Sequence, residues 1–166
     1  GAWAHAALDA RRPKVHAGIR TVSVGNVSAG GTGKTPFVRW CVGELAAAGL
    51  RPAIALRGYA ARGGTSDEAE EYRDLLPGTP LAVGGDRAAA IAGMRAAHPE
   101  VDCVVLDDGF QHRRLARDVD IVLVDATRPA LGGRLLPAGW LRERASVLRR
   151  ADHVIVTRAH EADEPA

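Results

Sequence analysis

The chain has 166 residues, enough for one well-buried domain and too few for two of ordinary size. Its 46% of apolar and 25% of charged residues exclude an intrinsically disordered protein. A formal net charge of +2, from 22 basic and 20 acidic residues, gives no electrostatic case for a nucleic-acid partner.

The first predicted elements are a strand, a glycine-rich loop and a helix. Residues 21–24 are short and apolar, and residues 37–48 show a helical periodicity that ends before Gly49. The loop between them is of the kind that binds a nucleoside triphosphate, because its backbone N–H groups and the dipole of the next helix face the phosphates. Its predicted nucleotide-binding residues are Gly30, Gly31, Thr32, Gly33, Lys34 and Thr35.

Two details of this loop bear on its chemistry. Lys34 is expected to reach the β- and γ-phosphates, and the Thr35 hydroxyl to ligate Mg²⁺. The G-x-x-x-x-G-K-[ST] pattern has a glycine at the position of Ser28, so the chain departs from the pattern there. A simple glycine turn is the alternative interpretation.

The rest of the chain alternates short apolar strands with helices. Strands are expected at residues 53–56, 81–83, 102–106, 121–124 and 154–156. Helices are expected from near Ser66, at residues 87–97 and at residues 141–150. Such alternation indicates an α/β protein with a parallel sheet and helices on both faces, the three-layer P-loop NTPase-like arrangement.

Polar residues follow several of these strands, at the sheet edge where open parallel sheets bind ligands. Asp107 and Asp108 follow the strand at 102–106 in the position of a Walker-B acid, which would hold Mg²⁺ or its water shell. Adjacent acids at this point are often only a turn or a helix cap. Residues 57–59 and Asp125 are expected at the same edge.

Four further polar residues have a functional and a plain interpretation. Asp67 and Glu68 open a predicted helix, where acids compensate the dipole, but one of them could accept the proton of an acceptor hydroxyl. His112 could be an ordinary loop histidine. Arg87 at a helix start opposes the dipole, which favours a phosphate clamp over a surface residue.

The sequence shows neither a metal-binding cysteine pattern nor a membrane span. Cys41 and Cys103 lack CxxC or Cys/His spacing, so we expect both to be reduced core residues. No apolar run approaches the ~18 residues that cross a bilayer and no signal peptide is visible, so a cytosolic or membrane-peripheral protein is expected. Because the chain begins with Gly1 and ends in a polar stretch at 159–166, we expect it to be cut from a longer one.

Taken together, the ordered motifs resemble the tetraacyldisaccharide 4′-kinase (lipid A 4′-kinase) family, over about residues 20–158. The Asp-Asp-Gly-Phe-Gln-His and Leu-Pro-Ala-Gly runs are more specific than the P-loop. The matching segments are residues 23–26 with 30–36, 57–59, 66–68, 86–87, 107–112, 136–139 and 141–143.

The resemblance implies a kinase that uses ATP and Mg²⁺. The family transfers the ATP γ-phosphate to the 4′-hydroxyl of tetraacyldisaccharide 1-phosphate, an acylated glucosamine disaccharide lipid, and forms lipid IV-A at the cytoplasmic face of the bacterial inner membrane. Its partners would be this lipid and the membrane surface, with no nucleic acid.

The resemblance also implies roles for individual residues. Asp67 matches the catalytic base, with Lys34 and Asp108 also catalytic. The metal ligands would be Thr35, Glu68 and Asp107. Gln111 and His112 match positions near the nucleotide, and Arg87 and Arg142 match positions near the substrate.

By the same resemblance, residues 1–19 are the remnant of a membrane-associating segment and residues 20–166 a P-loop kinase domain that lacks the family's second domain. The histidine that partners the base in the family comes from that second domain. Ala69, Gly132 and Trp140 depart from the family pattern in loops that leave the chemical groups in place.

Two other functions stay open. A partition ATPase or metal-insertion GTPase shares the loop and sheet, but a partition ATPase usually has lysine where this chain has Ala29, and no Asn-Lys-x-Asp guanine motif follows Val156. The chain could also bind nucleotide without catalysing transfer.

Overall fold

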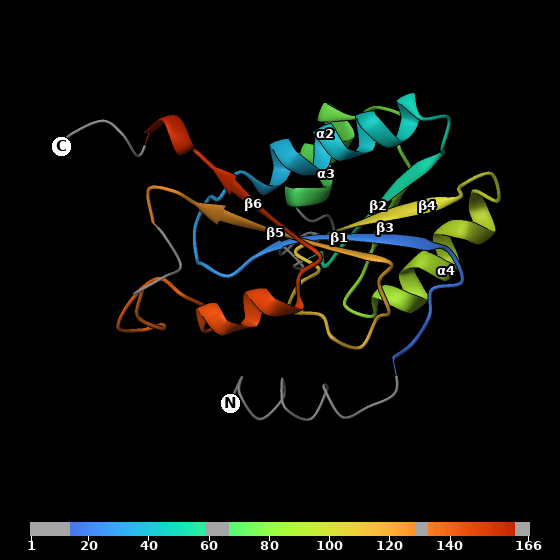
Figure 1. Ribbon diagram of the computed structural model, residues 1–166. Helices are drawn as coiled ribbons and strands as arrows, with labels where there is room; N and C mark the ends of the chain where they lie inside the picture. Colours follow the sequence, from blue (N-terminus) through green and yellow to red (C-terminus); the bar gives the residue numbers. More distant parts are fainter. Residues whose placement is uncertain (1–13, 59–66, 129–132, 162–166) are drawn as a thin grey trace.

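A six-stranded parallel sheet organises the chain in the computed structural model, which describes residues 14–58, 67–128 and 133–161 (Figure 1). The strand order is β3-β2-β4-β1-β5-β6. Its strands are β1 (Arg20–Asn26), β2 (Pro52–Leu56), β3 (Leu81–Val83), β4 (Cys103–Asp107), β5 (Val119–Asp125) and β6 (His153–Thr157). All pairings are parallel, as predicted, and β1 lies between β4 and β5.

Helices cover both faces of this sheet, which confirms the three-layer prediction (Figure 1). Helices α2 (Lys34–Ala47) and α3 (Asp67–Leu75) pack on one face, and α4 (Arg87–Ala97) and the 3₁₀ helix η1 (Ala145–Arg150) on the other. A last 3₁₀ turn, η2 (Ala159–Glu161), follows β6.

Apolar strand residues of both faces form the core. On the α2 and α3 face, Val24, Ile54 and Leu123 are fully buried against Val38 of α2. On the α4 face, Val104 and Leu106 pack with Ile91. This double burial explains why the strands are nearly continuous apolar runs. Cys41 and Cys103 are buried and unpaired, as predicted.

Local sequence explains the helix starts. The Asp86 side chain accepts a hydrogen bond of 3.2 Å from the Ala89 N–H, and α4 has the predicted bounds. Gly33, with φ 80°, precedes α2, and Gly49, with φ 85°, ends it. No helix in the described ranges is long and apolar enough to span a membrane.

One predicted helix is wrong in part. Residues 141–150 were expected to be helical, but only Ala145–Arg150 forms a 3₁₀ helix. The backbone before it pairs elsewhere: Leu141 bridges Ser28, and the Arg142 N–H donates to the Val27 carbonyl across 2.8 Å. The predicted positions Tyr59, Ser66 and Gly132, and most of the segment 1–19, lie outside the described residues.

Candidate functional site

The predicted P-loop forms a tight turn between β1 and α2 at the carboxyl edge of the sheet. Gly30 and Gly33 have φ of 105° and 80°, a region that L-residues with a Cβ rarely adopt. Ser28 is not among the described residues with a positive φ, so its backbone does not require glycine. The missing first glycine therefore leaves the loop intact.

Asn26, at the end of β1, supports this loop from below. Its side chain is fully buried, and Nδ2 donates to the Ser28 carbonyl at 2.8 Å and the Thr32 hydroxyl at 2.9 Å. Its Oδ1 lies 3.4 Å from Nζ of Lys34. Asn26 was predicted only as part of the motif at residues 23–26, so this role was missed.

Asp107 closes β4 beside the P-loop, as predicted. Its Oδ2 accepts a hydrogen bond of 2.9 Å from the hydroxyl of Tyr72 on α3, while its buried Oδ1 has no partner within the described residues. Burial raises the pKa of Asp107, opposed by the Tyr72 bond and the Lys34 charge. Burial and the Asp107 charge also raise the pKa of Tyr72 well above its ordinary value.

Asp108 faces two basic side chains. Both of its oxygens accept from Nη1 of Arg142, at 3.1 and 3.0 Å, and Oδ1 lies 3.7 Å from Nζ of Lys34. Asp108 has a φ of 52°, a conformation that is uncommon for a residue with a Cβ and often marks functional positions. The structure thus brings together three predicted site residues.

The N-terminal turn of α3 brings acids to the same edge. The pKa of Glu68 is raised, first by partial desolvation and then by the negative charges of Asp107 and Asp108. Asp67 begins the helix and is exposed. A cleft of about 410 Å³ opens between the P-loop and α3, and residues 31–36, Glu68, Tyr72 and Asp107 line it together with Arg158.

Arg87 and Gln111, two other predicted residues, bond to the ends of β4 and β1. Arg87 is buried, and its guanidinium donates to the carbonyl of Asp107 at 3.3 Å. Burial first, and then the charge of Arg57, lowers the pKa of Arg87. Gln111 donates to the Asn26 carbonyl at 2.7 Å, and His112 is half-buried nearby in sequence. The predicted ligand roles of these residues stay predictions.

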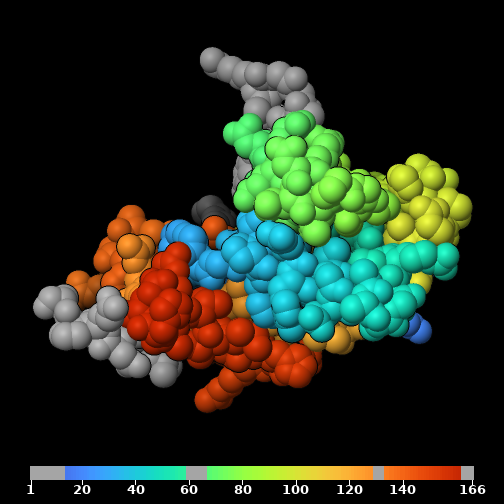
Figure 2. Space-filling model, turned by 90° about the horizontal axis from the view of Figure 1, so that it is seen from above, coloured from blue at the N-terminus to red at the C-terminus, as the bar shows by residue number. Residues whose placement is uncertain are grey.

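Two site residues at the end of β6 were missed. The Thr157 hydroxyl donates to the Thr32 carbonyl, and the Arg158 guanidinium to the Gly31 carbonyl and the Asp125 carboxylate. Seen from above the α2 face, the blue start of α2 lies close to the red segment of β6 and η2, in agreement with Figure 1 (Figure 2). The predicted Asp125 therefore contacts the P-loop through Arg158.

A magnesium site is compatible with the groups at this edge. Among the described residues, no three of His, Cys, Asp or Glu cluster as a ready metal site. The predicted ligands Thr35, Glu68 and Asp107 all line the same cleft. The buried Oδ1 of Asp107 has no partner among the described residues, so it is an available acceptor. Hard oxygen donors of this kind suit Mg²⁺, which keeps several waters and uses few protein ligands.

Comparison with known proteins agrees with this geometry. A family model described as tetraacyldisaccharide-1-P 4′-kinase matches residues 3–166. A tetraacyldisaccharide 4′-kinase of Azoarcus sp. (strain BH72) is 45% identical over 150 residues, which cover 82% of this chain and 43% of that protein. One of Pseudomonas aeruginosa (strain LESB58) is 40% identical over 167 aligned residues, 93% of this chain and 50% of that protein.

Solved structures give the same result for the fold. A crystal structure of LpxK from Aquifex aeolicus in complex with ATP has a TM-score of 0.79 and 32% identity, covering 93% of this chain and 53% of that one. The hydrogenase maturation factor HypB of Archaeoglobus fulgidus, with a TM-score of 0.53, 14% identity and coverage of 90% and 72%, shares the fold alone. The chain spans about half the length of the curated relatives it matches.

Proposed function

The chain belongs to the tetraacyldisaccharide-1-P 4′-kinase family, and on this premise we propose that it supplies the ATP-binding site of a lipid A kinase. The reaction would transfer the γ-phosphate of ATP to the 4′-hydroxyl of tetraacyldisaccharide 1-phosphate. The observation that carries the proposal is a cleft of about 410 Å³ that the P-loop lines together with Asp107 and Glu68. A lipid acceptor would put this reaction at the cytoplasmic face of the inner membrane.

The P-loop would bind the triphosphate. Its backbone N–H groups and the start of α2 supply donors, and Nζ of Lys34 supplies a positive charge. The 3.7 Å contact between Lys34 and Asp108 is long, so phosphate oxygens can take over the ammonium at little cost. The hydrogen bond of 3.4 Å from Nζ of Lys34 to Oδ1 of Asn26 holds the Lys34 side chain over the loop before the phosphates bind.

Thr35, Asp107 and Glu68 would hold Mg²⁺, which neutralises the negative charge on the β- and γ-phosphates. The donor set supports this: Oδ1 of Asp107 is buried without a partner in the described chain, and burial raises its pKa. A carboxylate in that position is stabilised by a cation. Tyr72 holds the other oxygen in place.

Asp67 would accept the proton of the sugar hydroxyl. It stands at the exposed start of α3, one residue before Glu68, where an acceptor can approach from solvent. Arg142, fixed on Asp108, would position the acceptor, and Arg87 would support the acidic pair from below through the Asp107 carbonyl. In-line transfer depends mainly on such positioning.

The proposal is tested in two steps. Titration of ATP and GTP into the 166-residue chain with Mg²⁺ is expected to show a preference for ATP; a preference for GTP would favour a nucleotide switch. Because the chain spans about half of its relatives, we expect no lipid phosphorylation by it alone.

For the second step, these residues replace the matching region of the Pseudomonas aeruginosa relative. The chimera is expected to transfer ³²P from ATP to the disaccharide lipid. A folded chimera that binds ATP but transfers nothing would contradict the kinase assignment.

A further inference from the structure

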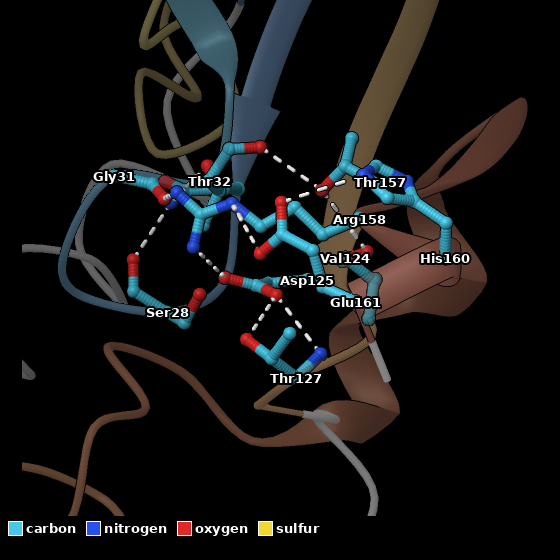
Figure 3. Close-up of polar contacts among 11 residues, drawn as sticks. Ser28, Gly31, Thr32, Val124, Asp125, Thr127, Thr157, Arg158, His160 and Glu161 are labelled. Carbon is cyan, nitrogen blue, oxygen red and sulfur yellow. Dashed lines mark hydrogen bonds and ion pairs between the residues drawn. The ribbon is translucent and has the colours of Figure 1, made fainter. Parts of the chain in front are cut away.

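The end of β6 holds two consecutive carbonyls of the P-loop, as Figure 3 shows. Nη2 of Arg158 donates to the Gly31 carbonyl across 2.6 Å, and the Thr157 hydroxyl donates to the Thr32 carbonyl across 3.0 Å. These are contacts between residues more than 120 positions apart. They tie the loop after β1 to a strand that is not its neighbour in the sheet.

The two bonds fix the direction of the next N–H groups. In a planar trans peptide the carbonyl of one residue and the N–H of the next point to opposite sides. With the Gly31 carbonyl held toward Arg158, the Thr32 N–H points away from β6, and the Thr32 carbonyl fixes the Gly33 N–H in the same way. These are donors that a P-loop presents to phosphate.

Arg158 is itself held in place by Asp125. Oδ2 of Asp125 lies 3.1 Å from Nη1 of Arg158, and Oδ1 accepts from the N–H and the hydroxyl of Thr127 at 3.0 and 2.6 Å (Figure 3). The Asp125 side chain is 4% exposed and that of Arg158 is 40% exposed. Arg158 also has a φ of 54°, so its backbone is set for this contact in a conformation that arginine rarely adopts.

We propose that Thr157 and Arg158 are positioning residues that preorganise the P-loop for phosphate, with Asp125 orienting Arg158. The inference rests on the proposed function, because it assumes that the loop binds a polyphosphate. Rigid loops lose less conformational freedom on binding, so the two bonds raise affinity for the phosphates by fixing the loop.

The test compares Arg158→Ala, Arg158→Lys and Thr157→Val with the unchanged chain. The control is Arg51→Ala, since Arg51 also forms an ion pair, with Asp102 at 3.8 Å, but lies outside the P-loop network. Calorimetric titration uses tripolyphosphate, ATP and adenosine. Tripolyphosphate reports on the loop without a nucleoside.

We expect Arg158→Ala to weaken tripolyphosphate and ATP binding by about tenfold, as loss of a charge-assisted bond does, and Thr157→Val by about threefold. Arg158→Lys recovers part of the loss, because lysine reaches one acceptor but not both. Arg51→Ala and adenosine binding are unchanged. In ¹⁵N-resolved spectra, the amide protons of Thr32 and Gly33 shift downfield on phosphate addition, and less in Arg158→Ala and Thr157→Val.

The outcomes separate the inference from the function it rests on. Unchanged affinity in Arg158→Ala and Thr157→Val would overturn the inference alone. Loss in Arg158→Ala with none in Thr157→Val would also overturn it, because it would show direct contact of Arg158 with phosphate. If the unchanged chain binds neither ATP nor tripolyphosphate, the proposed function fails and the inference with it. Should Arg158→Ala not fold, the nearly isosteric Thr157→Val decides.

Discussion

The hydroxyl of Tyr72 donates to Oδ2 of Asp107 across 2.9 Å, with both side chains buried, and so links α3 to the end of β4. Replacing Tyr72 by Phe removes this side-chain donor from the buried Asp107 carboxylate, whose Oδ1 already lacks a partner among the described residues. The expected cost is about 1–3 kcal/mol in the free energy of unfolding, measured by urea denaturation. ATP affinity in the presence of Mg²⁺ should fall as well. Unchanged stability would show that the bond is not formed in solution.

Asp107→Asn is expected to make the protein more stable and to weaken its Mg²⁺-dependent binding of ATP. Burial raises the pKa of Asp107, so its folded pKa lies above the unfolded one, and the folded state binds more protons between the two. Stability therefore falls as the pH rises from about 3.9 through the folded pKa. The amide removes this loss, and at neutral pH we expect a gain of about 0.5–2 kcal/mol.

The measurement for Asp107→Asn is urea denaturation from pH 4 to pH 8. The variant should show a flatter pH dependence than the unchanged chain, while its Mg²⁺-dependent ATP binding declines. A variant that is less stable at neutral pH would contradict the prediction.

Asp108 offers a matched pair of substitutions. Both Asp108→Gly and Asp108→Ala remove the carboxylate that faces Lys34 and Arg142, but only glycine adopts a φ of 52° without strain. The glycine variant should be the more stable by about 1 kcal/mol. Denaturation curves of the two proteins at one pH check this, and equal stabilities would show that the loop relaxes.

Gly25 and Gly43 should respond in opposite directions to alanine. A Cβ on Gly25 would lie 2.5 Å from Cβ of Phe110 and 2.9 Å from its backbone N, so Gly25→Ala should cost about 1–3 kcal/mol. Gly43 in α2 has no atom within 4 Å of such a Cβ, and Gly43→Ala should gain about 0.5–1 kcal/mol. Thermal unfolding of both variants tests the contrast.

Lys34→Ala is expected to weaken ATP binding by at least tenfold while changing stability little. Lys34 makes only a 3.7 Å ion pair and a 3.4 Å hydrogen bond in the described structure, so the folded state depends on it weakly. Its positive charge matters once phosphates are present. Titration and denaturation of the same sample measure the two effects, and an unaltered Kd would argue against phosphate binding at this loop.

The sequence predicted the features that depend on neighbours along the chain. Strands buried on both faces appear as apolar runs, and an alanine-rich segment predicted α4 with the bounds that it has. The glycine loop and the acids after β4 were found because parallel strands bring their carboxyl ends to one edge.

The features that sequence missed depend on partners far away. The local sequence around Thr157 and Arg158 looks like that of any strand end. These two residues matter because they bond to the loop after β1, which is far away in the sequence. The role of Tyr72 was missed for the same reason, because its partner Asp107 is distant in the sequence. The segment before Ala145 was predicted helical because its pairing with Ser28 leaves no periodic signal.

The position of β1 in the middle of the sheet has a consequence for synthesis. Arg20 pairs with Cys103 and Val22 with Val119, so β1 leaves the ribosome before either of the two strands that it pairs with. Until β4 and β5 emerge, the P-loop has no sheet to rest on. Translation speed through the codons for residues 27–118 should therefore govern how long β1 stays exposed to chaperones.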